Sequence, residues 1–303
     1  MAEIRRYGDW TVHSAARKIS RERVANYMES YVTNKMPVLS PNTVNGYDTI
    51  LRLLKKEYNW FWNTVLWDVG RAELQALVNE MKKDGRSPKY IRNVYGLVTA
   101  VLRENDMPVP KVTLPQQTRP DLFEPTISDI REILKAVRGT RLEIPVLFAL
   151  NGLRQGEICA LRWPNDFRGR TVHVAGSIAR NADGVPVRKA PKTTASDRYV
   201  RISQDLLDKV ASQGFVTDYS NPCVLSHAFG RFVRKNNLPQ MRFHDIRHFW
   251  LSYLHQNGIP DQTLQKLGGW ETDSCMKRVY RYALEDDTAV KLDSAIARLA
   301  DFD

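Results

Sequence analysis

The amino-acid sequence predicts a mainly α-helical protein with a small antiparallel β-sheet, divided into two domains. Three observations lead to this fold class. Apolar residues recur with the period of an amphipathic helix through the first hundred residues and through much of the second half. A short stretch between residues 171 and 202 follows the alternating pattern of strands instead, and a proline-rich segment separates the two parts.

Residues 20–107 are expected to form a bundle of helices, after an N-terminal extension over residues 1–19. Four segments are expected to be helical: Val24–Val32, Val44–Tyr58, Leu74–Met81 and Ile91–Leu102. Two of these helices follow a serine and a proline, at Ser40-Pro41 and Ser87-Pro88. The serine side chain caps free amide groups of the first turn, and proline fits the first helical position because no N–H is needed there.

The linker between the domains is expected at residues 108–125, which hold five prolines and little hydrophobic periodicity. Proline lacks an amide hydrogen and holds the chain extended, so a run of prolines is typical of a spacer. The sequence therefore places the domain boundary in this segment.

Residues 126–303 are expected to form an α+β domain. Thr126-Ile-Ser-Asp129 resembles a capping box in which aspartate takes the usual place of glutamate, and it predicts a helix start. A second helix is expected to end at Gly152. The strand patterns at Thr171–Val174 and Tyr199–Ile202 predict a small antiparallel sheet, after which the chain becomes helical again.

The charge favours a polyanionic partner. Lysine and arginine outnumber aspartate and glutamate by 45 to 34, for a net charge of +11. The surplus is present in both parts: 19 basic against 12 acidic side chains in residues 1–120, and 26 against 22 in residues 121–303. Nucleic acid is the partner this favours, because each neutralised phosphate releases counterions. The alternative is a soluble protein that is basic but does not bind nucleic acid.

The three cysteines, Cys159, Cys223 and Cys275, are far apart and form no CxxC pair. This argues against both a disulfide framework and a zinc site, and it fits a reducing cytoplasm. The N-terminus lacks the apolar stretch of a secretory signal. No apolar run approaches the length of roughly 20 residues that a membrane span needs. We therefore expect a cytoplasmic protein with no membrane partner.

Four separated segments contain residue types that suit chemistry on phosphate: NGLRQGEICALRW (151–163), APKTTASDRYV (190–200), HDIRHFW (244–250) and LGGWETDSCMKRVYRYAL (267–284). Each alone is weak evidence. His244 and Arg247, for example, project from one face of a helix, but such a pair is more often an exposed helix turn.

In this order and spacing, the four segments resemble the catalytic domain of tyrosine recombinases, the phage integrase family. The resemblance covers nearly the whole chain, since residues 20–107 are similar to the helical core-binding domain of that family. It implies a site-specific DNA recombinase of a phage or integrative mobile element. Such an enzyme cleaves and rejoins duplex DNA through a 3′ phosphotyrosine and a Holliday junction, with no cofactor, metal or ATP. The implied partners are double-stranded attachment sites, a homotetramer on DNA, and accessory DNA-bending or directionality factors.

Carried over residue by residue, the resemblance implies six catalytic residues: Arg154, Lys192, His244, Arg247, Trp270 and the nucleophile Tyr280. Glu157 and His248 are implied as supporting residues. The residue types suit the reaction. Guanidinium forks and other donors stabilise the extra charge of a pentacoordinate phosphorus, and a lysine protonates the leaving 5′ oxygen. A tyrosine nucleophile keeps the bond energy in a covalent intermediate.

Three assignments have rivals. Tyr282 stands two residues after Tyr280, but Tyr280 has the family's usual spacing from Trp270. Lys189 is on the same expected hairpin as Lys192. Trp270 stands where most members of the family have histidine, and an indole can pack or donate a hydrogen bond but cannot titrate usefully.

Other expectations concern the ends of the chain and the DNA-binding surface. Lys55, Lys56, Lys89 and Arg92 are predicted DNA contacts of the first domain, with plain solvated surface as the alternative. Only about 20 residues precede the first expected helix, so an arm-binding domain is not expected unless the sequence is part of a longer protein. The apolar stripe in residues 286–303 predicts a last helix that docks on a neighbouring protomer.

Three other functions stay open. The first is an Xer-type recombinase that resolves chromosome dimers. The second is a type IB topoisomerase, which shares the chemistry. The third, from another class, is a DNA-binding regulator that does not cut.

Overall fold

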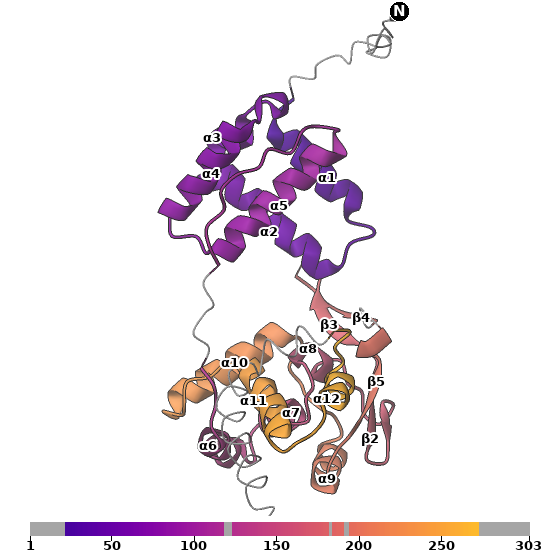
Figure 1. Ribbon diagram of the computed structural model, residues 1–303. Helices are drawn as coiled ribbons and strands as arrows, with labels where there is room; N and C mark the ends of the chain where they lie inside the picture. Colours follow the sequence, from indigo (N-terminus) through magenta and orange to yellow (C-terminus); the bar gives the residue numbers. More distant parts are fainter. Residues whose placement is uncertain (1–21, 118–122, 182–183, 191–193, 273–303) are drawn as a thin grey trace, which may run out of the picture. The chain divides into compact units, whose positions relative to one another are not determined.

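A computed structural model describes residues 22–117, 123–181, 184–190 and 194–272. Contacts divide the chain into two compact units, Met1–Pro120 and Asp121–Asp303, and each is described by itself. Both are dominated by helices, and the second also carries short strands (Figure 1). Among the described residues, no helix has the length and apolar character that crossing a membrane requires.

The first unit is a helical bundle, as the sequence predicts. Its elements are α1 (Val24–Lys35), α2 (Pro41–Glu57), α3 (Asn59–Asn63), the 3₁₀ turn η1 (Leu66–Asp68), α4 (Arg71–Lys83) and α5 (Pro88–Glu104). The two serine caps form: Ser40 Oγ accepts the Thr43 amide at 3.3 Å, and Ser87 Oγ accepts the Tyr90 amide at 3.2 Å. The short helix α3 carries Phe61 into the buried core.

The beginning of the expected linker packs against this bundle. Met107, directly before it, is buried, and Val109, Val112 and Leu114 of the segment itself pack on the core. Three side chains of α4 and α5 bind the backbone of this segment: Gln75 at Thr113, Tyr95 at Pro110 and Arg92 at Pro115. The segment from Pro108 to Pro115 therefore belongs to the folded surface of the first unit.

The second unit combines helices with two small sheets. Its helices are α6 (Ile127–Val137), α7 (Glu143–Ala149), α8 (Gln155–Ile158), α9 (Gln204–Gln213), α10 (Pro222–Lys235), α11 (Phe243–Gln256) and α12 (Asp261–Gly268), with the 3₁₀ turn η2 (Thr194–Ser196). The capping box at the start of α6 forms, because Thr126 Oγ1 accepts the Asp129 amide and the Asp129 carboxylate accepts the Thr126 amide at 2.8 Å.

The strands form two antiparallel sheets where the sequence predicted one. The strands β1 (Phe167–Arg168), β2 (Thr171–Val174) and β5 (Arg198–Arg201) form the first sheet in the order β1-β2-β5. The second is the hairpin of β3 (Ser177–Arg180) and β4 (Pro186–Lys189), which ends at Lys189, one of the two lysines expected on a hairpin. Val172 and Val200, paired across β2 and β5, point into the core.

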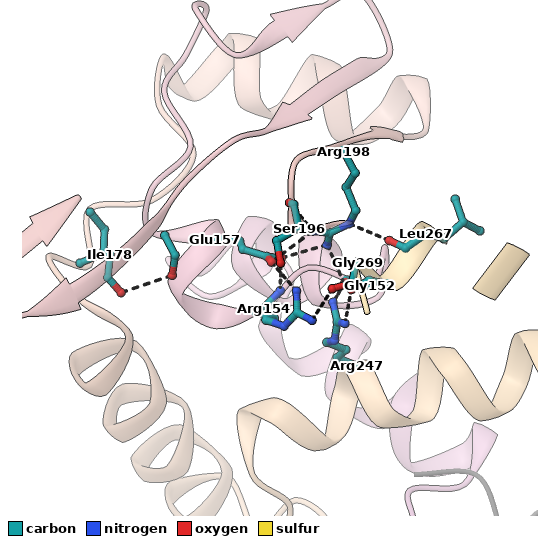
Figure 2. Close-up of polar contacts among 11 residues, drawn as sticks. Gly152, Arg154, Glu157, Ile178, Ser196, Arg198, Arg247, Leu267 and Gly269 are labelled. Carbon is teal, nitrogen blue, oxygen red and sulfur yellow. Dashed lines mark hydrogen bonds and ion pairs between the residues drawn. The ribbon is translucent and has the colours of Figure 1, made fainter. Parts of the chain in front are cut away.

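One hydrophobic core supports the second unit. It joins α6, α7, α9, α10 and α11 to the inner face of the β1-β2-β5 sheet. A smaller cluster around Trp250, Leu251 and Leu264 joins α11 to α12. As a result, the start of α8, the start of α11 and the end of α12 are held together, and these are the places where the conspicuous residues lie (Figure 2).

Candidate active site

Arg154 is held by the first turn of α8. Its backbone amide donates to Glu157 Oε2 at 2.8 Å, and its Nη1 donates to Glu157 Oε1 at 2.7 Å. Its Nη2 donates to the carbonyl of Gly269 at 2.9 Å, which connects this turn to the end of α12. About a third of the Arg154 side chain stays exposed, so a ligand can reach the guanidinium group.

Glu157 is buried beneath the arginine cluster, where a second arginine holds it. Arg198, on the inner face of β5, donates from Nη2 to Glu157 Oε2 at 2.9 Å and from Nη1 to Glu157 Oε1 at 3.1 Å. Burial alone raises the pKa of Glu157, but the Arg198 hydrogen bonds and the surrounding positive charges lower this pKa to about 2. Glu157 is therefore an ionised carboxylate at neutral pH.

Arg247 lies one turn into α11 and is almost fully buried, with 2% of the residue exposed. Its Nη1 donates to the carbonyl of Gly152, and its Nη2 donates to the carbonyl of Gly268 at 2.6 Å. Burial lowers the pKa of Arg247, as does the charge of Arg154. A guanidinium group starts from so high a pKa that it still carries its charge at neutral pH.

Three successive carbonyls at the end of α12 each accept one arginine. Leu267 accepts Arg198 Nε at 2.7 Å, Gly268 accepts Arg247, and Gly269 accepts Arg154 (Figure 2). Three guanidinium groups and one carboxylate therefore meet in a small volume, with a formal surplus of two positive charges. Such a surplus, held before any ligand arrives, suits the binding of a phosphate group.

Trp270 follows this carbonyl series directly. The centre of its indole ring is 4.4 Å from the guanidinium carbon of Arg247 and 5.8 Å from that of Arg154. Both distances are within the range of a cation–π interaction. The indole ring therefore lies against both predicted catalytic arginines.

His244, at the start of α11, is half-buried close to the arginines. Burial, together with the charges of His248 and Arg247, lowers the pKa of His244 to about 4. The imidazole of His244 is therefore neutral at pH 7 and is able to donate one ring N–H. His248 packs edge-on against it, with ring centres 4.6 Å apart, and burial also lowers the pKa of His248.

Asp245 caps α11. Its carboxylate accepts the amide of Arg242 at 2.7 Å and also pairs with the Arg242 guanidinium group. This cap fixes the first turn of the helix, where His244 and Arg247 are carried.

A pocket of about 290 Å³ opens beside the cluster. Its lining comes from the start of α8, from both strands of the β3-β4 hairpin and from the end of α12, with Arg154, Lys189, Ser196 and Trp270 among the residues. Lys189, the rival of Lys192, is the last residue of β4 and faces this pocket. Lys192, Tyr280 and Tyr282 lie outside the described residues.

The positively charged residues predicted on the first unit differ in their surroundings. Lys55, Lys56 and Lys89 are exposed. Arg92 is half-buried, and its Nη2 donates to the carbonyl of Pro115 at 3.0 Å, so this guanidinium group already holds the chain segment that follows α5.

No metal site is found in the part of the chain that the structure describes. There, no group of three or more His, Cys, Asp or Glu side chains lies close enough together to hold a metal ion.

A model of the phage integrase family matches residues 126–286, which is more than half of the chain. The chain belongs to the phage integrase family. The integrase of Salmonella phage P22 is 24% identical over 300 residues, covering 89% of this chain and 72% of that protein. A tyrosine recombinase XerC-like protein of Caldanaerobacter subterraneus subsp. tengcongensis is 24% identical over 261 residues, covering 70% of this chain and 67% of that protein.

Solved structures of other integrases have the same fold as this family member. The Tn1549 transposon integrase in complex with transposon right end DNA has a TM-score of 0.76 and 18% sequence identity, covering 90% of this chain and 99% of that one. The lambda integrase in a tetramer bound to a Holliday junction has a TM-score of 0.64 and 16% identity, covering 86% of this chain and 78% of that one. The mainly helical fold with small antiparallel sheets is thereby confirmed.

In this phage integrase family protein, the structure brings together four of the six predicted catalytic residues: Arg154, His244, Arg247 and Trp270. Sequence reasoning missed Arg198, which donates hydrogen bonds to the Glu157 carboxylate and to the carbonyl of Leu267. A signal was present, because Arg198 is in phase with Val200 and Ile202 in the alternation of β5 and so belongs to its buried face.

Proposed function

We propose that the protein is a site-specific DNA recombinase of a phage or other mobile element, which cleaves and rejoins duplex DNA with Tyr280 as the nucleophile. The observation that carries the proposal is the preorganised cluster of Arg154 and Arg247 beside an open pocket. Membership of the phage integrase family supports the same reaction.

In the proposed cleavage step, the oxygen of Tyr280 attacks the scissile phosphorus, and the bond from phosphorus to the 5′ oxygen breaks. The phenolic proton leaves to water, and Lys192 protonates the departing 5′ oxygen. Arg154 and Arg247 bind the non-bridging oxygens, whose negative charge grows in the transition state. In rejoining, a 5′ hydroxyl of the partner strand attacks the phosphotyrosine and frees Tyr280, so that no ATP is consumed.

His244 fits the role of a neutral donor. Its lowered pKa keeps the imidazole uncharged at pH 7, and an uncharged imidazole donates one N–H without adding to the repulsion among the arginines. Glu157 and Arg198 are buried and hydrogen-bond to each other, and Glu157 also binds Arg154, so the proposed role of this pair is to hold Arg154 in place.

The remaining parts of the proposal concern partners. The helical first unit is proposed to grip duplex DNA through exposed lysines, of which Lys55, Lys56 and Lys89 are candidates. Four protomers are proposed to exchange strands on paired attachment sites, with DNA-bending or directionality factors setting the direction. The reaction is proposed to need no metal or cofactor and to take place in the cytoplasm of a bacterial host.

The test is a nicked suicide duplex that carries the end of the protein's own mobile element. The protein is incubated with this duplex, and covalent protein–DNA product is measured on a denaturing gel for wild type, Tyr280→Phe and Tyr282→Phe. We expect a covalent product that only Tyr280→Phe abolishes. If only Tyr282→Phe abolishes the product, the nucleophile has been assigned wrongly. Tight DNA binding with no covalent product from wild type would overturn the proposed reaction.

A matched pair of lysine variants assigns the general acid. Lys192→Ala and Lys189→Ala are compared on an ordinary duplex and on one whose scissile 5′ oxygen is replaced by sulfur. A thiolate leaves without needing a proton, so loss of the general acid is rescued by the sulfur substrate. We expect this rescue for Lys192→Ala only. Rescue of Lys189→Ala alone would transfer the role to the lysine that the structure places at the pocket.

A further inference from the structure

The indole of Trp270 has an unusual set of neighbours. The guanidinium carbons of Arg247 and Arg154 lie over the ring, 4.4 Å and 5.8 Å from its centre. The benzene edge lies over Gly268, and a methyl group on Gly268 would overlap the ring atoms Cε3 and Cζ3. These two atoms are on the side of the indole away from its nitrogen. The ring is therefore fixed against the turn at the end of α12 by its carbon edge.

The same turn also binds the two arginines. Gly268 and Gly269 accept hydrogen bonds from Arg247 and Arg154 in the plane of each guanidinium group, at 2.6 Å and 2.9 Å. Hydrogen bonds in that plane leave the flat faces of the group uncovered. A guanidinium face prefers to stack on an aromatic ring, because the ring's negative π face attracts the cation. The carbonyls and the indole thus restrain different directions of motion.

The arginines have a clear need for such restraint. They are close to each other, and the charge of Arg154 contributes to the lowered pKa of Arg247. Before DNA binds, this repulsion favours their separation. Glu157 offsets part of it, but only Arg154 and Arg198 hydrogen-bond to that carboxylate in the described structure, whereas Arg247 relies on carbonyls and on the ring.

We propose that Trp270 is a positioning residue that holds Arg247 and Arg154 in their phosphate-binding orientation through the π face of its indole. This inference rests on the proposed recombinase function and adds a role for the ring face that is separate from donation by the indole N–H. Two other roles are possible for a tryptophan here: donation of its N–H to the phosphate, and packing alone. The three roles respond differently to changes in the ring.

Substitutions at Trp270 separate the ring face from the N–H. Phenylalanine keeps an aromatic face and has no N–H, whereas histidine keeps a donor and has a smaller, less electron-rich ring. Single-turnover cleavage of the nicked duplex is measured for Trp270→Phe, Trp270→His and Trp270→Leu, together with DNA affinity. The proposal expects the cleavage rate to fall in the order Phe, His, Leu, with affinity changed less than the rate. A His variant that cleaves faster than the Phe variant would overturn it.

Fluorinated tryptophan separates stacking from packing, because fluorine withdraws electron density from the π face and changes the ring volume very little. The same withdrawal makes the indole N–H a stronger donor. Packing therefore predicts no change in rate, N–H donation predicts an equal or higher rate, and cation–π stacking predicts a lower rate. For a cation–π interaction of ordinary strength, we expect roughly a 2-fold to 10-fold fall in single-turnover rate with difluorotryptophan.

The chain has seven tryptophans, so the labelling needs a matched control. The same fluorotryptophans are incorporated into Trp270→Phe, which keeps the other six. We expect the rate to fall stepwise with fluorine content in wild type and to stay level in the Trp270→Phe background. An equal response in both proteins, or no response in wild type, would overturn the inference. Because unlabelled wild type is assayed alongside, absence of any covalent product would instead count against the proposed function.

Discussion

Replacing Arg198 with methionine removes the buried partner of Glu157 while keeping a long, flexible side chain in the same space. The change deletes two hydrogen bonds to the Glu157 carboxylate, at 2.9 Å and 3.1 Å, and one to the carbonyl of Leu267 at 2.7 Å. It also deletes two longer ones, to the carbonyls of Ser196 and Gly152, both at 3.4 Å. Glu157 stays buried, with 4% of its surface exposed, and keeps its contacts with Arg154. A buried carboxylate then lacks its main counter-charge.

Two estimates of the cost agree. Removing one partner of a buried ion pair costs roughly 3–5 kcal/mol. The pKa of Glu157 falls from 4.5 to about 2 in the folded protein. A shift of this size corresponds to roughly 3 kcal/mol of stabilisation at neutral pH, to which Arg198 contributes most. We therefore expect Arg198→Met to destabilise the second unit by about 3 kcal/mol, which lowers Tm by roughly 6–12 °C for a unit of this size.

Urea unfolding and thermal unfolding measure this loss, with Arg201→Met as the matched control. Arg201 is on the same strand but on its exposed face, so the same substitution there is expected to change the free energy of unfolding by less than about 0.5 kcal/mol. Equal effects of the two substitutions would refute the argument that Arg198 neutralises Glu157.

The pH dependence gives a second check. Because the folded-state pKa of Glu157 is depressed, its stabilisation is present above pH 4.5 and is lost as the pH falls towards about 2. The difference in unfolding free energy between wild type and Arg198→Met should therefore be largest near pH 7 and shrink below pH 4.5. A difference that stays constant down to pH 3 would show that the ion pair is not its cause.

Three further predictions follow from single contacts. Gly152→Ala should destabilise the second unit by roughly 2–5 kcal/mol in urea unfolding. Gly152 has a φ of +79°, and a Cβ there would meet the Trp250 ring at 2.6 Å. A loss of unfolding free energy below about 1 kcal/mol would contradict this reasoning. Because burial and neighbouring charges lower the pKa of His244 to about 4, its imidazole should show no NMR titration between pH 8 and roughly pH 5. Its contribution to the free energy of unfolding should fall as the pH drops from 6.5 towards 4. A titration midpoint near pH 6.5 would refute the burial argument. Gln75→Ala should speed hydrogen exchange of the Thr113 amide about 5-fold, because it removes the acceptor of a 2.8 Å hydrogen bond. Unchanged exchange would show that the segment after α5 is held by other contacts.

Much of the fold could be predicted because its signals are local. Serine-proline starts and apolar stripes fall within single helices, and α2 and α5 begin at Pro41 and Pro88 as those signals indicate. The short α3 was not predicted, because a helix of five residues is too brief to show a stripe. The strands of the β3-β4 hairpin were not delimited for a related reason: each has only four residues, and only Ala179 among them is fully buried, so their apolar pattern is weak.

The site was predictable where motifs carry it and unpredictable where it depends on long-range contacts. Arg154, His244 and Arg247 stand in recognisable segments. Arg198 acts through Glu157, 41 residues before it, and through Leu267, 69 residues after it. No local pattern reports such contacts. The packing of the segment after α5 was equally hidden, because prolines predict an extended backbone but not the surface against which it lies.

The end of α12 explains how so much positive charge can be held together without a ligand. The last carbonyls of a helix have no partners within the helix, and the helix dipole gives that end a partial negative charge. Here Leu267, Gly268 and Gly269 present these carbonyls to three different arginines. The helix end therefore satisfies the guanidinium donors and, with the Glu157 carboxylate, offsets part of their repulsion.

This arrangement also accounts for the paired glycines in the sequence LGGW. Gly269 has a φ of +64°, and a Cβ there would meet Arg198 Nη1 at 2.9 Å and the carbonyl of Ala195 at 3.1 Å. At Gly268, a Cβ would displace the Trp270 ring from its place against the arginines. Both glycines are thus needed for close approach. Gly269 lets the Arg198 guanidinium group reach the end of α12, and Gly268 lets the Trp270 indole lie against that end. A helix end, a carboxylate and an aromatic face together surround the arginines, and the formal surplus of two positive charges that remains suits the proposed binding of a phosphate.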